Sequence, residues 1–216
     1  AGYAVNAHVC YIYIRGEYFN EGKRLQEAIN QAYEKKFLGN DACGSGWSFD
    51  IPHFRILNQD EIIGNYEFGW ELEAPVIEMN LYMPWLLSKF RTLGGSIESN
   101  KFDSIEEVPG EFIINCSGLG ARLLSNDEEV IPVRGQVVYI KQDPGFGRYD
   151  QRPESLTYTI PRRDVTVLGG TAQKGDWDET IRKKETQDIE SKCEVFWPDL
   201  DRQNIVGSAV GLRPSR

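Results

Sequence analysis

Two short segments near the end of the chain decide its fold: residues 156–161 read LTYTIP, and residues 165–171 read VTVLGGT. Both are rich in β-branched and aromatic residues, which favour strands. Pro-Arg-Arg-Asp at residues 161–164 separates them and is typical of a turn. The sequence therefore predicts a pair of antiparallel strands, the first of which carries Tyr158.

An arginine, Arg213, follows a further strand predicted at residues 204–210. A guanidinium offers a planar two-point fork to a carboxylate, and a phenol such as that of Tyr158 offers one more donor. Together they suit a small carboxylate ligand. The alternative is structural, with Tyr158 as a half-buried strand aromatic and Arg213 as a surface ion-pair donor.

Composition indicates a globular chain of one large domain or two small ones: it has 216 residues, of which 26% are charged and 12% aromatic. Its net charge of -9 argues against nucleic acid and anionic membranes as partners. The basic clusters at residues 162–163 and 182–184 are interpreted as solvated faces.

The four cysteines (Cys10, Cys43, Cys116 and Cys193) form no Cys-x-x-Cys pair, so the sequence does not favour a zinc site. We predict free, buried thiols. No apolar run is long enough for a membrane span and no signal peptide opens the chain, which predicts a soluble, intracellular protein. The chain starts without Met and stops within a motif, so we expect a piece of a longer protein.

The first half of the chain mixes strands and helices. Its predicted elements are a strand within residues 1–18, a helix at 20–38, a loop at 41–50, a strand at 54–57, a short helix at 58–62 capped by Asn58, and a strand-rich stretch at 68–77.

A second helix is predicted from Asn80 to Gly94-Gly95, and strands are predicted at residues 96–102 and 111–116, an order typical of an α/β layer. The expected buried stripe of this helix consists of Tyr82, Leu86, Leu87, Phe90 and Leu93. The remainder is predicted to be β-rich, with a strand at 135–140 and a third helix at 179–197 whose buried side carries Ile189, Cys193, Phe196 and Trp197.

Six sequence motifs follow one another in the second half. They are IINCSG (113–118), VRGQV (133–137), YTIP (158–161), VTVLGGT (165–171), GDW (175–177) and GLRPSR (211–216). In this order they resemble the D-amino-acid oxidase family of flavoproteins, which includes the D-aspartate oxidases. The resemblance extends over residues 69–216.

The resemblance implies an FAD-dependent oxidase that transfers hydride from the Cα of a D-amino acid to flavin. The products would be a 2-oxo acid, ammonia and, through reoxidation by molecular oxygen, hydrogen peroxide. It implies that Arg213 and Tyr158 are catalytic and hold the substrate carboxylate, with Ile160 also contacting substrate. It places Lys101, Phe102, Cys116, Ser117 and Gly118 near FAD.

Several positions depart from the family pattern. Glu154 stands where the vertebrate enzymes have a lid tyrosine, a role that Tyr149 is a candidate to take. Ala172 stands where D-aspartate oxidases have a substrate-selecting arginine, and Arg152 lies near the place of a second one. The family's opening Gly-x-Gly-x-x-Gly motif is not found in this sequence, nor is its C-terminal glycine-rich segment.

We therefore expect a broad or neutral D-amino-acid substrate, with D-aspartate, glycine or N-methyl amino acids as alternatives. A flavin-free carboxylate-binding module and a purely structural domain are alternatives of another class. A homodimer is left open. The expected compartment is peroxisomal in a eukaryote and cytoplasmic in a bacterium.

The predicted fold class is α+β. A mixed, largely antiparallel substrate-domain sheet with flanking helices is expected beside part of an α/β FAD-binding domain. Residues 1–79 are assigned to the substrate domain, residues 80–125 to the FAD-binding remnant, and residues 126–216 to the β-rich substrate-binding domain.

Overall fold

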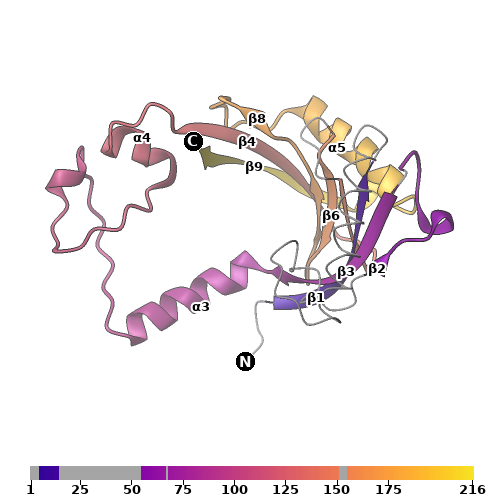
Figure 1. The fold of residues 1–216 in the computed structure, drawn as a ribbon, viewed down its shortest axis with the longest axis horizontal. Helices are drawn as coiled ribbons and strands as arrows, with labels where there is room; N and C mark the ends of the chain where they lie inside the picture. The colour runs from indigo at the N-terminus through magenta and orange to yellow at the C-terminus, as the bar shows by residue number, and fades with distance from the viewer. Residues whose placement is uncertain (1–4, 15–54, 67, 151–154) are drawn as a thin grey trace, which may run out of the picture.

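A computed structural model describes residues 5–14, 55–66, 68–150 and 155–216, the first of these ranges by its backbone (Figure 1). The helix predicted at residues 20–38 and the loop predicted at 41–50 lie outside the described residues. Arg152, a candidate substrate contact, lies outside them as well.

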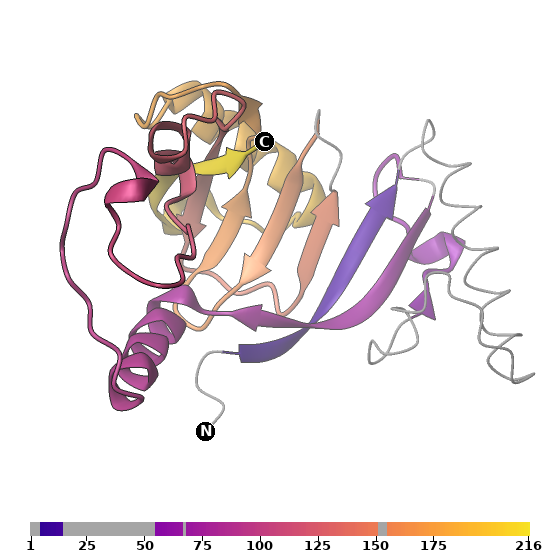
Figure 2. The same ribbon diagram turned by 60° about the vertical axis from the view of Figure 1, so that its left-hand side comes forward.

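Strands from both halves of the described chain join in one nine-stranded sheet (Figure 2). Eight of them follow the order β2-β3-β1-β5-β6-β7-β4-β8, and the ninth, β9, lies off this path and pairs with β4. The pairs are antiparallel except for β1 with β5, which confirms the mixed, largely antiparallel sheet. The strands are β1 (Val5–Ile14), β2 (Arg55–Ile56), β3 (Phe68–Ile77), β4 (Ile131–Ile140), β5 (Gly147–Asp150), β6 (Thr157–Pro161), β7 (Thr166–Gly169), β8 (Gln173–Lys174) and β9 (Ile205–Ser215).

The two faces of the sheet differ, because successive side chains of a strand point to opposite sides. Along β4, Val138 and Ile140 are buried, whereas Val137 and Tyr139 are only half-buried. Helix α5 (Lys183–Phe196) packs on the buried side. The core there consists of Val138, Ile140, Leu168, Ile189, Cys193, Trp197 and Leu200. The other face is the open face, and it carries the candidate site.

Helix α5 has the buried side that the sequence predicts, but it begins at Lys183 and not near residue 179. Residues before it are held in an extended path, since the carbonyl oxygens of Asp178 and Thr180 accept hydrogen bonds from Arg134. Tertiary hydrogen bonds therefore override the helical periodicity in this segment.

A smaller cluster attaches the segment before β3 to the sheet. The short 3-10 helix η2 (Gln59–Glu61) forms where a helix capped by Asn58 is predicted, and the Glu61 carboxylate accepts from the Asn58 backbone N–H at 2.8 Å. Tyr66 packs against Phe196 and donates to the Asp150 carboxylate at 2.9 Å. Another 3-10 helix, η5 (Arg202–Asn204), precedes β9.

Residues 78–130 add no strand to the sheet, and the strands predicted at 96–102 and 111–116 do not form. This part contains α3 (Met79–Thr92), η3 (Ile105–Glu107), η4 (Gly118–Gly120) and α4 (Ala121–Leu124). A strand needs a neighbouring strand for its backbone hydrogen bonds, and the described residues offer none here. The prediction of strands in this segment is therefore wrong for the structure.

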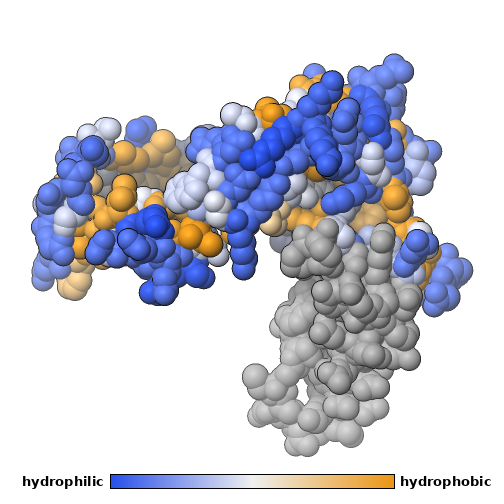
Figure 3. Space-filling view, turned by 90° about the horizontal axis from the view of Figure 1, so that it is seen from above, coloured by the Kyte–Doolittle hydropathy of each residue, from blue (hydrophilic) through white to orange (hydrophobic). Residues whose placement is uncertain are grey.

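The buried stripe predicted for α3 is also wrong. The helix starts one residue early, with Glu78 at its N-cap, and ends as predicted before Gly94, whose φ is +88°. None of its residues is buried, and Leu93 beyond its end is 87% exposed. Figure 3 shows apolar residues at the surface of the part of the molecule that residues 78–130 form. The periodicity correctly identifies an apolar stripe, but no apolar layer of the described residues covers it.

No helix among the described residues has the length and apolar character needed to cross a membrane.

Candidate functional site

Tyr158 lies on the open face of β6, directly opposite Gly169 of β7. A Cβ atom built on Gly169 would stand 2.0 Å from the Cζ atom of the Tyr158 ring, and one built on Gly170 would stand 2.9 Å from its hydroxyl oxygen. The phenol therefore lies across the backbone of these two glycines. The Gly-Gly pair is needed at this place because any side chain would collide with the ring.

Arg213 lies on β9 opposite Val133 of β4, and its guanidinium lies across Gly135. A Cβ atom on Gly135 would stand between 2.4 and 2.6 Å from the guanidinium atoms. The Nη1 atom donates to the Thr171 carbonyl at 3.3 Å. Within the part of the chain that the structure describes, no carboxylate pairs with Arg213, so the alternative of a surface ion-pair donor has no support there.

Strand register puts both side chains on the same face. Tyr158, Gly169, Val137 and Ala209 form one row across four strands, and Arg213 lies four residues beyond Ala209, which is an even number. No described residue hydrogen-bonds the Tyr158 hydroxyl. The open face therefore presents a guanidinium and a phenol whose donors are available to a carboxylate.

The electrostatics favour a protonated phenol. Burial raises the pKa of Tyr158 above its ordinary value, although the charge of Arg213 acts in the opposite direction. A raised pKa keeps the proton on the hydroxyl throughout the neutral range. Tyr158 is thus a hydrogen-bond donor under ordinary conditions.

Two other predicted substrate residues lie next to Tyr158. Tyr149 pairs with it across β5 and β6, with ring centroids 6.4 Å apart and ring planes 27° from parallel. Ile160 is half-buried two residues further along β6, on the same face. These side chains give the surroundings of Tyr158 an apolar, aromatic character.

The predicted cofactor residues fall into two groups. Cys116, Ser117 and Gly118 form a bend that reaches the end of β9, where a Cβ atom on Gly118 would contact Pro214 at 3.9 Å. Gly118 has a φ of +60°, and the Asn115 side-chain oxygen accepts from the Ser117 hydroxyl at 2.7 Å. The bend therefore lies beside the end of β9 that carries Arg213.

Lys101 and Phe102 lie in the irregular segment after α3. The ammonium of Lys101 is 3.5 Å from the Asp103 carboxylate, and 89% of the lysine side chain is exposed. Phe102 is half-buried. Cys116 is an exposed free thiol, so the prediction that the cysteines are buried holds for Cys193 and is wrong for Cys116.

Sequence reasoning assigned no role to Arg134 and Gln136, which lie on the buried side of β4. Arg134 donates to the carboxylate of Glu185 at 2.6 Å and to the side-chain oxygens of Gln173 and Gln136. Gln136 in turn accepts from the Arg182 backbone N–H at 2.9 Å. These bonds fasten the start of α5 to the sheet, behind the site.

The Arg-Gly-Gln motif therefore has two roles on opposite faces. Its polar residues anchor α5, and Gly135 between them leaves room for the Arg213 guanidinium. The sequence signal that could have revealed the anchoring role is the presence of two polar residues at the buried positions of an otherwise apolar strand.

The fold is a largely antiparallel sheet that presents a guanidinium and a phenol on one face. The chain belongs to the FAD dependent oxidoreductase family (DAO), whose sequence model matches residues 16–216. This family is FAD dependent. The resemblance drawn from the sequence motifs is thereby confirmed.

Two relatives illustrate the similarity. The D-amino-acid oxidase of Rubrobacter xylanophilus is 33% identical over 201 residues, which cover 90% of this chain and 60% of that protein. The human D-aspartate oxidase is 33% identical over 174 residues, covering 79% of this chain and 51% of that protein. The chain thus spans 51–60% of the length of these curated relatives.

Solved structures support the fold. Glycine oxidase from Geobacillus kaustophilus matches 99% of this chain and 60% of its own chain, with a TM-score of 0.70 at 13% identity. An FAD-bound L-alpha-glycerophosphate oxidase from Mycoplasma pneumoniae matches 99% of this chain with a TM-score of 0.67 at 16% identity. At such identities the likeness concerns the fold alone.

Proposed function

We propose that the protein to which this chain belongs oxidatively deaminates D-amino acids with FAD, producing 2-oxo acids, ammonia and hydrogen peroxide. The observation that carries the proposal is the common face of Tyr158 and Arg213, each lying across glycine backbone and each with donors available to a ligand. The similarity to a protein named D-amino-acid oxidase, at 33% identity, supports a D-amino acid as the substrate.

Arg213 and Tyr158 hold the substrate carboxylate in this proposal. The fork of the guanidinium fixes the plane of the carboxylate, and the Tyr158 hydroxyl adds a third bond that limits its rotation. Fixing a reactant in this way can lower a barrier by several kcal/mol. Each donor is itself held in place, because the Thr171 carbonyl and the glycine backbone restrict where the two side chains can lie.

The bend of Cys116, Ser117 and Gly118 fits the family's cofactor, since small residues and a left-handed glycine let a flat ring approach the backbone closely. We assign to these residues, and to Lys101 and Phe102, the contacts with FAD. When bound there, FAD would supply the acceptor for the hydride of the substrate Cα, and molecular oxygen would take up the electrons as hydrogen peroxide. Tyr158 and Arg213 need only orient the substrate, because hydride transfer from a neutral amine requires no general base.

We propose neutral D-amino acids as the preferred substrates. Tyr149 and Ile160, which flank Tyr158 on the open face, offer apolar contacts to a substrate side chain. D-aspartate is the near alternative, and glycine or N-methyl amino acids are a further one. A homodimer, and an intracellular compartment, belong to the same proposal and are tested by light scattering and by cell fractionation.

The test is a peroxide-coupled assay of the complete gene product with FAD, using D-alanine, D-aspartate, glycine and the L-enantiomers. We expect peroxide from neutral D-amino acids and none from L-amino acids. Arg213→Ala should remove most of the turnover. A complete protein that retains FAD but oxidises none of these substrates contradicts the proposal, and carboxylate binding without FAD would instead favour the flavin-free binding module.

A further inference from the structure

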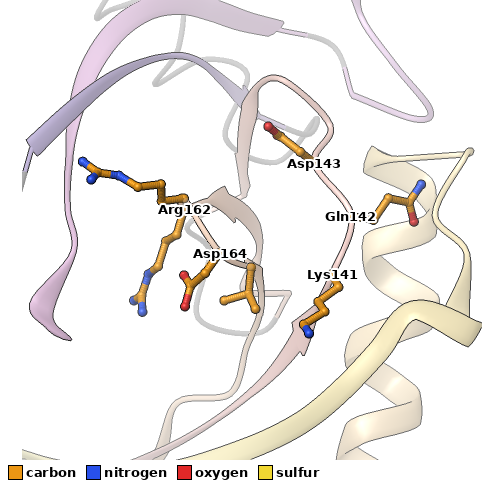
Figure 4. A pocket seen from close by; sticks show the side chains of 7 residues that line it. Lys141, Gln142, Asp143, Arg162 and Asp164 are labelled. Atoms are coloured by element: carbon orange, nitrogen blue, oxygen red, sulfur yellow. The ribbon is translucent and has the colours of Figure 1, made fainter. Parts of the chain in front are cut away.

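A hollow lined mainly by polar residues lies at the far end of the open face, where β4 ends and the β6–β7 turn begins (Figure 4). Its volume is about 300 Å³. The residues that line it are Lys141, Gln142, Asp143, Arg162, Arg163, Asp164 and Val165. None of them belongs to the carboxylate site described above.

Two of its cations lack a partner among the described residues. No described carboxylate pairs with Lys141 or with the Arg162 guanidinium, and the Nε atom of Arg162 is buried without a hydrogen-bond partner. Arg163, by contrast, is engaged: its Nε lies 3.7 Å from the buried Glu78 carboxylate. The hollow therefore has two cationic side chains whose charges no described carboxylate neutralises, which favours an anion.

The acidic residues of the hollow neutralise only part of its positive charge. Asp143 is committed to its own loop, because its carboxylate accepts from the Gly145 backbone N–H at 2.8 Å. Asp164 has no hydrogen bond or ion pair within the described residues, so its charge opposes an anion in the hollow. The lining still contains three cations against two carboxylates.

The walls of the hollow are fixed by hydrogen bonds. The Gln142 side chain points away from it toward the chain after α5 (Figure 4), donating to the Asp199 carbonyl at 2.7 Å and accepting from the Asp201 N–H at 2.9 Å. The turn is closed by the Arg162 N–H donating to the Val165 carbonyl at 2.9 Å. Ligand binding would therefore require little ordering of the backbone.

We propose that this hollow is a second binding site, specific for a small free anion such as phosphate or a carboxylate. The strand geometry separates it from the first site. Arg162 lies four residues beyond Tyr158, directly after β6. The Arg213 guanidinium lies over Gly135, two residues in the other direction from Val137, which is in the same row as Tyr158. Six strand residues span roughly 20 Å, further than an aspartate held at Arg213 could reach with its second carboxylate.

The experiment is calorimetric titration of the full chain with inorganic phosphate, and separately with acetate, at constant ionic strength. Arg162→Gln should weaken binding about tenfold, as expected when a charged hydrogen bond is lost. Lys141→Gln should weaken it a few-fold, and Asp164→Asn should tighten it, because it removes the opposing charge. The matched control is Lys192→Gln, which removes an exposed cation of α5 outside the hollow.

The relative affinities for the two anions identify the class of ligand. Tighter binding of phosphate than of acetate assigns the site to phosphate-like anions, and the reverse assigns it to carboxylates. The proposal is overturned if neither anion binds the wild-type chain, or if Lys192→Gln weakens binding as much as Arg162→Gln, since that would indicate non-specific charge attraction. Circular dichroism of each variant establishes that it is folded, and Lys141→Gln provides an independent arm if Arg162→Gln is not. Both titrations are repeated on Arg213→Ala, which removes the proposed carboxylate site, so acetate bound at Arg213 is scored separately and failure here leaves the proposed function untouched.

Discussion

The replacement Gly135→Ala tests whether the position of the Arg213 guanidinium determines substrate binding. The new methyl group would stand 2.4 Å from an Nη atom, and ordinary contact begins at 3.4 Å. The guanidinium must therefore move by at least about 1.0 Å. A misplacement of about this size can cost roughly 100-fold in rate.

The assay is kcat/KM of the FAD-loaded complete protein toward a neutral D-amino acid, together with the affinity for a small carboxylate. We expect kcat/KM to fall by about 100-fold and carboxylate affinity to fall with it. Stability should change by less than about 1 kcal/mol, since alanine is at least as favourable as glycine within a strand and the displaced atoms end a flexible side chain.

Gly207→Ala is the matched control. Gly207 lies on β9 opposite Tyr139, and nothing lies within 4 Å of the place its Cβ atom would take. It receives the same methyl group in the same sheet and should keep wild-type kinetics. If Gly135→Ala remains within twofold of this control in kcat/KM, the reasoning about Arg213 is refuted.

Three further predictions concern the hydrogen bonds of Arg134 that anchor α5, the two described cysteine thiols, and the Tyr158 hydroxyl. Arg134→Met, which breaks a buried ion pair, should lower the free energy of unfolding in urea by about 3–5 kcal/mol, whereas Lys101→Met at an exposed pair should cost under about 1 kcal/mol; equal losses would contradict the anchoring role. Burial raises the pKa of Cys193 to about 12, so iodoacetamide should label Cys116 and spare Cys193 in peptide maps of the native protein. Because the pKa of Tyr158 is raised above 10.0, its donor is present below that pKa and carboxylate affinity should decline only above pH 10; a decline in the neutral range that Tyr158→Phe abolishes would contradict this.

The segment from 78 to 130 shows where sequence reasoning reached its limit. The α3 periodicity and the apolar residues of 96–102 and 111–116 correctly report side chains suited to burial. Burial also needs a partner surface, and the described residues provide none, so α3 lies exposed and no strand forms at 96–116. A local pattern predicts which face of an element is apolar, but it cannot predict whether another element covers that face.

For the candidate site, the sequence by itself determined the residue types and their order: a phenol, a guanidinium and the glycines near them, on segments that alternate as strands do. Only the tertiary structure decided that Gly169 receives the Tyr158 ring and Gly135 the Arg213 guanidinium, and that Tyr149 lies beside Tyr158. The physical reason is strand register. Side-chain alternation is local and can be read from the sequence, whereas the cross-strand partner depends on pairing between segments distant in the chain, such as β4 with β9.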